Sequence, residues 1–357
     1  MLSKTLRSKL PVRIAAGAAI AVASVGMAFG ATHLTETGSS LLYPLFNLWV
    51  PAYTKNHPGV KIDTAATGSG TGIAQSTKGI VQMGASDAYL SNALMKKHKD
   101  MLNIPVAISS QMVNYNVPGA NDEHLKLSGP VLAGIYEGKI RYWDNKKIES
   151  MNSGADLPHK QIVPIHRADG SGDTFLFTQF LSKSAHGWKR KVGYGTTVSW
   201  PNVQGAIGAT GNSGMVTALS NNPYAIAYIG VSYKDQTDKA GLGEAKLKNR
   251  AGNYVLPDEK TVPAAAAKMV PKTPKDERIS LIFAPGAQSY PIINYEYVLV
   301  KADQPDAETA KTLKDFLTWA VDKNGGNDMS FLSQVHFMPL PPKARKLTEQ
   351  QIDKIHG

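Results

Sequence analysis

Cysteine is absent from this chain of 357 residues, and its absence excludes two kinds of exported protein. Without cysteine the chain has no disulfide scaffold and no cysteine-linked lipid anchor. The apolar content of 42% still supplies enough side chains for real cores. Large domains are stable without disulfides because they bury a larger fraction of their surface. At about 150 residues per domain, the length predicts two domains.

Sequence patterns of catalysis are also missing. The nine histidines form no HExxH pattern and no close pair, and no Gly-x-Ser-x-Gly nucleophile turn occurs. The glycine-rich stretch from Thr67 to Gly72 lacks the lysine that a phosphate-binding loop of nucleotide hydrolases requires. We therefore predict a protein that is not an enzyme and that carries neither a metal ion nor a cofactor.

Positive charge exceeds negative charge without forming a stripe. The net charge is +11, and it falls to +7 when the four cations of the first thirteen residues are left out. The remaining cations are scattered and are not interleaved with aromatic residues, so we predict no nucleic-acid partner. A weakly basic chain attracts small anions, although solubility alone also explains such a charge.

The first thirty residues differ in composition from the rest. A basic stretch that ends at Arg13 is followed by a small, apolar run from Ile14 to Gly30. This pattern is typical of a secretory signal peptide over residues 1–30, with Ala31 as the first mature residue. The apolar run is short and rich in alanine and glycine, which disfavours the alternative of a membrane anchor. We therefore predict an exported, periplasmic protein.

The mature chain alternates strand-like and helix-like segments, which predicts an α/β fold with mainly parallel sheets. One helix shows an apolar face of period 3.6, and Asp306 is its predicted N-cap residue. The predicted strands lie at 60–63, 106–117, 162–165, 224–229 and 292–301, and this helix lies at 306–322.

Three glycine-rich turns follow strand-like segments and precede helix-like ones. They lie at Gly38–Pro44, Thr67–Gly72 and Asp169–Asp173, and each contains serine. The start of a helix offers free N–H groups and a partial positive charge of about half a unit, which together favour anions. Serine and aspartate also cap ordinary helices, so each turn alone has a purely structural explanation.

Two charged residues stand out beside these turns. Arg167 lies just before the third turn, between His166 and Asp169, and its forked guanidinium suits a tetrahedral oxyanion. Asp87 lies in the small-residue segment Gly84–Ala88, where a helix cap is the alternative explanation. The third turn is therefore either a well-capped helix start or part of an oxyanion pocket.

Several of these motifs together resemble one known family. The segments GSSLLYP, TGSGTG, GASDA, HRADGSGDTF and PIINYEY are similar, in this order, to the periplasmic phosphate-binding protein of the high-affinity phosphate ABC transporter. The resemblance runs from about Leu34 to Pro341. It implies a two-lobed, type II periplasmic-binding-protein fold with a hinge and a ligand cleft between the lobes. It also implies binding of inorganic phosphate and its delivery to the membrane permease and ATPase subunits of a transporter.

The resemblance also implies a set of ligand-binding residues. Leu42-Tyr43 stands where other members have a Thr-Phe pair, so the first-loop hydroxyl must come from one of two serines. Asp173 stands where threonine is frequent, and we expect its carboxylate to point away from the anion and cap the helix. Asp169 is expected to fix Arg167. The implied phosphate ligands are Ser39, Ser40, Leu41, Ser69, Asp87, Arg167, Ser171, Gly172 and Asp173.

The same resemblance implies that the chain crosses twice between the lobes. The candidate crossings are the strands near Val113–Val117 and near Tyr290–Asn294. Lobe I then comprises residues 31–116 together with 291–357, and lobe II comprises residues 117–290.

Asp87 distinguishes phosphate from other oxyanions. A carboxylate beside an anion is acceptable only if the anion carries a proton that it can donate, as phosphate does at neutral pH and sulfate does not. Asp87 therefore predicts rejection of sulfate. Two alternatives stay open, namely a binder of another tetrahedral oxyanion such as sulfate or molybdate, and a phosphate-binding protein with a sensing or adhesion role.

Overall fold

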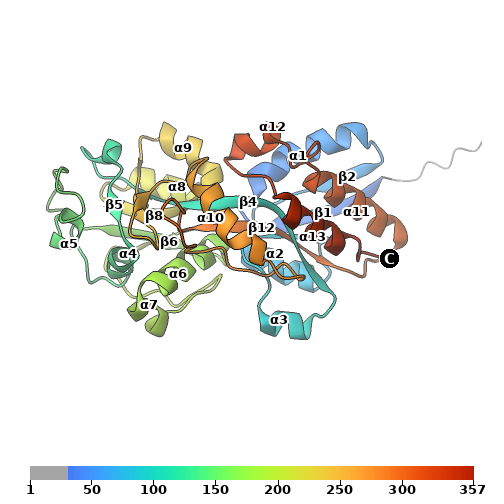
Figure 1. Cartoon of the computed structure of the whole chain (residues 1–357), viewed down its shortest axis with the longest axis horizontal. Helices are drawn as coiled ribbons and strands as arrows, with labels where there is room; N and C mark the ends of the chain where they lie inside the picture. The colour runs from blue at the N-terminus through green and yellow to red at the C-terminus, as the bar shows by residue number, and fades with distance from the viewer. Residues whose placement is uncertain (1–30) are drawn as a thin grey trace, which may run out of the picture. The chain divides into compact units, whose positions relative to one another are not determined.

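The computed structural model describes residues 31–357, which are drawn in colour in Figure 1. The predicted signal peptide, residues 1–30, lies outside the described residues. Within residues 31–357, no helix has both the length and the apolar character needed to cross a membrane.

Strands and helices alternate along most of the chain. The strands are β1 (Thr32–Gly38), β2 (Val60–Asp63), β3 (Met83–Ser86), β4 (Met101–Tyr115), β5 (Lys126–Leu127), β6 (Val163–Arg167), β7 (Ile207–Ala209), β8 (Ala225–Gly230), β9 (Gly243–Glu244), β10 (Lys246–Lys248), β11 (Tyr254–Val255) and β12 (Ile293–Lys301). The α-helices are α1 (Tyr43–Asn56), α2 (Ser69–Thr77), α3 (Asn92–Lys97), α4 (Gly129–Tyr136), α5 (Lys146–Glu149), α6 (Gly172–Ser184), α7 (His186–Lys191), α8 (Gly211–Asn221), α9 (Lys234–Lys239), α10 (Thr261–Met269), α11 (Ala307–Val321), α12 (Met329–Leu332) and α13 (Pro342–Ile352). Short 3-10 helices are η1 (Asn121–Glu123), η2 (Val231–Tyr233), η3 (Val270–Lys272) and η4 (Ser333–Val335).

The main sheet has the strand order β2-β1-β3-β12-β4-β8-β6-β7, with β9 paired to β4. Strands β1, β2 and β3 are parallel to one another on one side, and β6, β7 and β8 are parallel on the other. Between these groups, β12 and β4 run antiparallel to each other and to their neighbours (Figure 1). The smaller sheet has the order β11-β10-β5.

The strand β4 joins the two halves of the sheet. Its residues from Met101 to Ser110 pair with β12, and its residues from Gln111 to Tyr115 pair with β8. Every residue of β4 is buried. The pairing partner changes between Ser110 and Gln111. We predicted the lobe boundary slightly later, at residue 116, and that boundary stays a prediction.

Each predicted strand and the predicted helix have a counterpart within residues 31–357. The predicted helix at 306–322 is α11, and Asp306 caps it by accepting a hydrogen bond from the Thr309 N–H at 2.8 Å. The prediction of mainly parallel sheets missed the antiparallel centre. A run of apolar residues such as β4 or β12 indicates burial on both faces, but it does not reveal the direction of the neighbouring strand.

An aromatic cluster packs α1 against α11. Trp49 on α1 is fully buried, and its ring makes edge contacts with Phe46, Phe316 and Trp319. Its indole N–H donates to the carbonyl of Gly326 at 2.8 Å, so its one polar atom is satisfied. This cluster fixes the position of α1, whose first turn follows the first glycine-rich loop.

We expect Trp49→Ala to lower the free energy of unfolding by about 3 to 5 kcal/mol, because it leaves a large cavity between α1 and α11. Trp49→Phe keeps most of the ring contacts and should cost clearly less. Urea denaturation followed by circular dichroism measures both variants. Equal losses for the two substitutions would contradict the packing role given to the indole ring.

Candidate functional site

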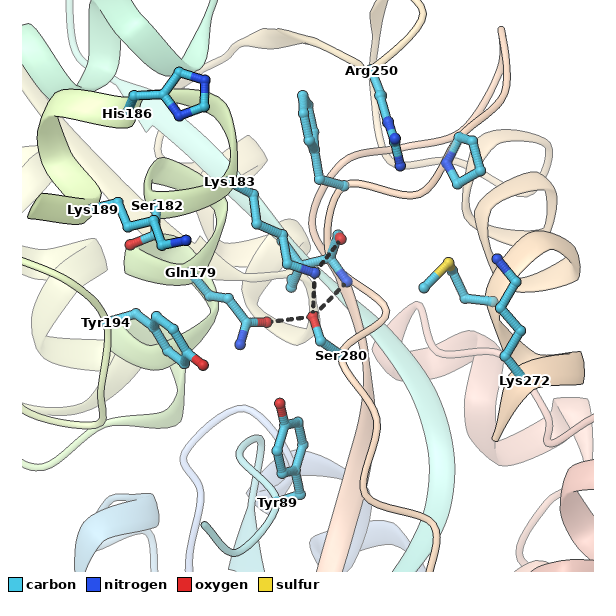
Figure 2. A pocket seen from close by; sticks show the side chains of 14 residues that line it. Tyr89, Gln179, Ser182, Lys183, His186, Lys189, Tyr194, Arg250, Lys272 and Ser280 are labelled. Carbon is cyan, nitrogen blue, oxygen red and sulfur yellow. Dashed lines mark hydrogen bonds between the residues drawn. The ribbon is translucent and has the colours of Figure 1, made fainter. Parts of the chain in front are cut away.

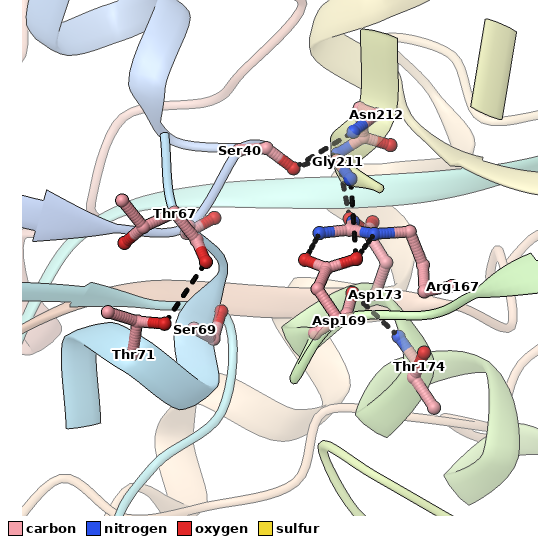
Figure 3. Close-up of polar contacts among 12 residues, drawn as sticks. Ser40, Thr67, Ser69, Thr71, Arg167, Asp169, Asp173, Thr174, Gly211 and Asn212 are labelled. Atoms are coloured by element: carbon pink, nitrogen blue, oxygen red, sulfur yellow. Dashed lines mark hydrogen bonds and ion pairs between the residues drawn. The ribbon is translucent and has the colours of Figure 1, made fainter. Parts of the chain in front are cut away.

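Turns at the carboxyl ends of parallel strands meet where the two halves of the sheet join (Figure 3). The turns after β1, β2 and β3 come from one half, and those after β6 and β7 come from the other. The two groups touch directly. The Gly70 N–H donates to the carbonyl of Gly170 at 2.8 Å, and the Asn212 side chain donates to Ser40 Oγ at 3.0 Å. The carboxyl ends of strands in open α/β sheets are the usual place for ligands.

Close packing at this junction requires glycine at two positions. A Cβ atom on Gly172 would overlap the Asp87 carboxylate and Ser69 Oγ. A Cβ atom on Gly38 would overlap the carbonyl of Ala85, and the φ angle of Gly38 is +144°. The glycines therefore let the turns approach each other at the level of the backbone.

Arg167, at the end of β6, is buried between two carboxylates. Its Nε donates to Asp169 Oδ1 at 2.7 Å and its Nη2 donates to Asp169 Oδ2. Its Nη1 donates to Asp173 Oδ2 at 2.9 Å. Burial favours the neutral form of Asp169, but the hydrogen bonds and charge of Arg167 outweigh burial and lower the pKa of this carboxyl. Asp169 therefore holds the guanidinium in a fixed plane.

Our expectation that the Asp173 carboxylate caps the helix is wrong. Its oxygens accept from Arg167 Nη1, from Gln111 Nε2 at 3.0 Å and from Asn212 Nδ2 at 2.7 Å. The cap of α6 is Ser171, whose Oγ accepts from the Thr174 N–H at 3.3 Å. The carboxylate turns inward because three donors there offset the cost of burying its charge.

Asp87 lies beyond the end of β3 and is 2% exposed. Ser39 Oγ donates to its Oδ1, and its own N–H donates to Ser69 Oγ at 3.2 Å. Burial raises the pKa of Asp87 well above its usual value, and the nearby charges of Glu296 and Asp173 raise it further.

Glu296 on β12 forms an acidic pair with Asp87. Its Oε1 accepts from Ser109 Oγ and from Asn294 Nδ2, the latter at 2.8 Å. Burial raises the pKa of Glu296 to about 7 in spite of these donors. Two neighbouring buried carboxyls resist ionising together, so the pair retains a proton near neutral pH.

The two serines of the first loop face different partners. Ser39 Oγ accepts from the N–H groups of Leu41 and Leu42, at 3.1 and 3.0 Å, while its proton is directed to Asp87. Ser40 Oγ accepts two hydrogen bonds from Asn212, at 3.1 Å from the backbone and 3.0 Å from the side chain.

The structure brings together all the residues that the sequence predicted for the site. The helix starts of α1, α2, α6 and α8 also lie at this junction. The first N–H groups of a helix have no acceptor within it. The site thus combines hydroxyls, backbone N–H groups and one arginine, which is a donor set suited to a small oxyanion.

Three polar residues of the site were missed by the sequence reasoning. Asn212 lies in the first turn of α8, in the glycine-containing segment Gly211–Gly214 that follows β7, so a pattern like that of the other strand ends was present. Gln111 and Glu296 are polar residues inside the long apolar strands β4 and β12. A buried polar side chain in such a strand needs a hydrogen-bond partner, so their presence in the sequence was a signal that could have pointed to the site.

Within residues 31–357, no three histidine, aspartate or glutamate side chains gather in a way that could hold a metal ion.

Comparison with known proteins identifies the family. The family model described as a PBP superfamily domain matches residues 23–324. The phosphate-binding protein PstS of Methanocaldococcus jannaschii is 36% identical over 306 residues, which cover 81% of this chain and 78% of that protein. The chain therefore belongs to the PstS family of phosphate-binding proteins. PstS of Pasteurella multocida is 33% identical over 339 residues, covering 95% of this chain and 93% of the relative.

Solved structures support the fold of this PstS-family chain. A phosphate-binding protein from Stenotrophomonas maltophilia superposes with a TM-score of 0.69 at 22% identity, covering 90% of this chain and 94% of that one. A putative phosphate ABC transporter substrate-binding protein with bound phosphate from Clostridium perfringens gives a TM-score of 0.60 at 17% identity, covering 87% and 100%. The predicted α/β, two-lobed type II fold and the family resemblance are thereby confirmed.

We expect Glu296→Gln to flatten the dependence of stability on pH. A carboxyl whose pKa is higher in the folded than in the unfolded state binds a proton more readily when folded, so its contribution to stability falls as the pH rises from about 4.5 to about 7. The substitution removes this loss, which amounts to up to about 3 kcal/mol. It also removes one charge that raises the pKa of Asp87.

Urea denaturation at several pH values across this interval measures the effect. Glu149→Gln, at an exposed position of α5, serves as the matched control because it removes the same charge at the surface. An unchanged pH profile for Glu296→Gln would show that Glu296 does not retain a proton in the folded protein.

Proposed function

We propose that this chain is a high-affinity, extracytoplasmic phosphate-binding protein that delivers inorganic phosphate to an ABC transporter. The observation that carries the proposal is the convergence of Arg167, Asp87 and several helix starts at one junction. The relatives named phosphate-binding protein PstS support it, since they match over most of the chain. The partners that we propose are the permease and ATPase subunits of the transporter, and the proposed location is the periplasm.

In this proposal phosphate lies between the turns of the two halves. Ser39, Ser40, Leu41, Ser69 and Asp87 bind it from lobe I, which comprises residues 31–116 and 291–357. Arg167, Ser171, Gly172 and Asp173 bind it from lobe II, residues 117–290, and Asp169 supports the arginine. The contacts from Asn212 to Ser40 and from Gly70 to Gly170 support such bridging, because they already join the two halves. Opening and closing at the hinge admits and releases the anion.

Asp173 contributes to this site through Arg167 and through its own N–H. Its carboxylate is already occupied by three donors, so it need not meet the anion. The N–H groups of Gly172 and Asp173, in the first turn of α6, are the donors that suit the phosphate oxygens.

The raised pKa of Asp87 makes the proposed discrimination against sulfate depend on pH. An ionised Asp87 accepts a proton from phosphate and repels sulfate, whereas a protonated Asp87 can donate to sulfate. Because burial and the charges of Glu296 and Asp173 raise its pKa, the change of state falls at a higher pH than for an ordinary aspartate. In this proposal, selectivity for phosphate therefore depends on whether Asp87 carries a proton.

We expect the preference for phosphate over sulfate to be stronger at about pH 8 than at about pH 5.5, because the raised pKa of Asp87 moves its uptake of a proton to higher pH. Asp87→Asn imitates the neutral acid with an amide donor, so sulfate binding should become measurable at both pH values. Titration calorimetry of the phosphate-stripped protein with each anion measures this. Comparable binding of both anions by the unmodified protein at about pH 8 would favour a general oxyanion carrier. Binding of neither would overturn the proposed function.

We expect Asn212→Ala to weaken phosphate binding by about tenfold, because it removes donors to Ser40 and Asp173 and so loosens the contact between the two halves. The loss should appear mainly as faster phosphate release, which a stopped-flow displacement experiment measures. Ser213→Ala, at the exposed neighbouring position, is the matched control. An unchanged release rate in Asn212→Ala would show that this contact does not hold the site closed.

A further inference from the structure

A second cavity, separate from the junction described above, has a volume of about 650 Å³ (Figure 2). Its walls include side chains of α6 and α7, the segment from Ser280 to Pro285, Arg250 and Lys272. None of the proposed phosphate ligands lines it. The cavity lies close to the proposed phosphate site without overlapping it. Two of its lining residues show this: Tyr89 is two residues after Asp87, and Gln179 lies on α6, which begins at Gly172.

The charge of this cavity has one sign. Its lining includes Lys183, Lys189, Arg250 and Lys272, together with His186. Among the residues that the structure describes, no aspartate or glutamate lines it. Like charges gathered in a concave surface with no counter-charge raise the free energy of the empty protein and attract anions.

Hydrogen bonds hold the ammonium group of Lys183 in place. Its Nζ donates to Ser280 Oγ at 2.8 Å and to the carbonyl of Ile282 at 2.9 Å, and Ser280 in turn donates to Gln179 Oε1. These contacts are neutral, so they orient the ammonium group without cancelling its charge. Burial and then the charge of Arg250 lower the pKa of Lys183 to about 8, and a bound anion would reverse the second effect.

The cations surround the cavity. Figure 2 shows His186 and Lys189 on one side, Arg250 and Lys272 on the other, and Lys183 between them. Cations spread in this way cannot all contact one compact anion, but an extended anion with several charges can reach both walls. The hydroxyls of Tyr89 and Tyr194 add uncharged donors to the lining.

We propose that this cavity binds a condensed phosphate, an anion in which several phosphate groups are joined in a row. Such an anion carries a negative charge on each unit, so that each unit can pair with a separate cation. The same chemistry occurs in inorganic polyphosphate and in the phosphate tail of a nucleoside triphosphate. The ring of Tyr89 already packs edge-on against Phe175 and Tyr297, and that of Tyr194 against Phe175, so the inorganic chain is the ligand we favour.

The test is a calorimetric titration with inorganic tripolyphosphate in the presence of saturating orthophosphate, so that the phosphate site is already filled. We expect binding at one site, and we expect the triple substitution of Lys183, Arg250 and Lys272 by Ala to weaken it at least about tenfold. The control is the triple substitution of Lys55, Lys78 and Lys346 by Ala, which removes the same charge from exposed positions outside the cavity. We expect the control to weaken binding by less than about threefold.

Each result of the titration either supports or overturns the proposed binding of a condensed phosphate. Absence of tripolyphosphate binding, or equal weakening by the two triple substitutions, would overturn the proposal. A parallel titration with ATP separates the two sources of the ligand, and ATP binding much tighter than tripolyphosphate would overturn the choice of the inorganic chain. Orthophosphate affinity, measured on the same variants, should stay within about twofold of that of the unmodified protein. This readout distinguishes failure of the second site from failure of the proposed phosphate site.

Discussion

The buried guanidinium of Arg167 is the group on which the site depends. A buried charge is stable only when it is paired, and here Asp169 and Asp173 occupy three of its nitrogens. Asp173 is tied in turn to Gln111 on β4 and to Asn212 on α8, and Asn212 reaches Ser40 on the opposite half. One ion pair thus connects β4, two helix starts and the contact between the two halves of the sheet. Removing any member leaves a buried polar group without its partner, which costs more than the lost bond alone.

The same cluster contains more acids than bases. Asp87 and Glu296 add two carboxyls to the two that hold Arg167, so the site cannot attract an anion by net positive charge. Attraction must instead come from fixed N–H groups, hydroxyls and helix starts, which act strongly where water is scarce. In a site of this kind, a carboxyl oxygen and an oxygen of the anion can lie within hydrogen-bond distance only if one of them carries a proton. Such a site therefore distinguishes anions by whether they carry a proton.

The sequence allowed the glycine-rich turns to be predicted because local rules govern them, whereas the family resemblance supplied the expected ligand roles of Arg167 and Asp87. Helix caps, glycine turns and strand ends depend on residues close together in the chain. Asp173 could not be oriented in the same way, since its carboxylate follows donors from β4 and α8 that are distant in sequence. The antiparallel centre of the sheet was missed for the same reason: the partner of β4 changes from β12 to β8 within one continuous, fully buried strand. Glu296 was not predicted because its role depends on its contact with Asp87, which is distant in the sequence.

The helix α6 links the two sites and shows that they rely on different physics. Its first turn supplies backbone donors at a buried junction, where salt screens interactions only weakly. Two and three turns further along, Gln179 and Lys183 face an open cavity whose cations are exposed to solvent. Charges in such a cavity act over about 10 Å at moderate ionic strength and lose strength as salt rises. The junction is therefore suited to tight recognition of one small anion, and the cavity to looser attraction of a longer one. Because both lie along one helix, an anion held in the cavity stays close to the junction without competing for its donors.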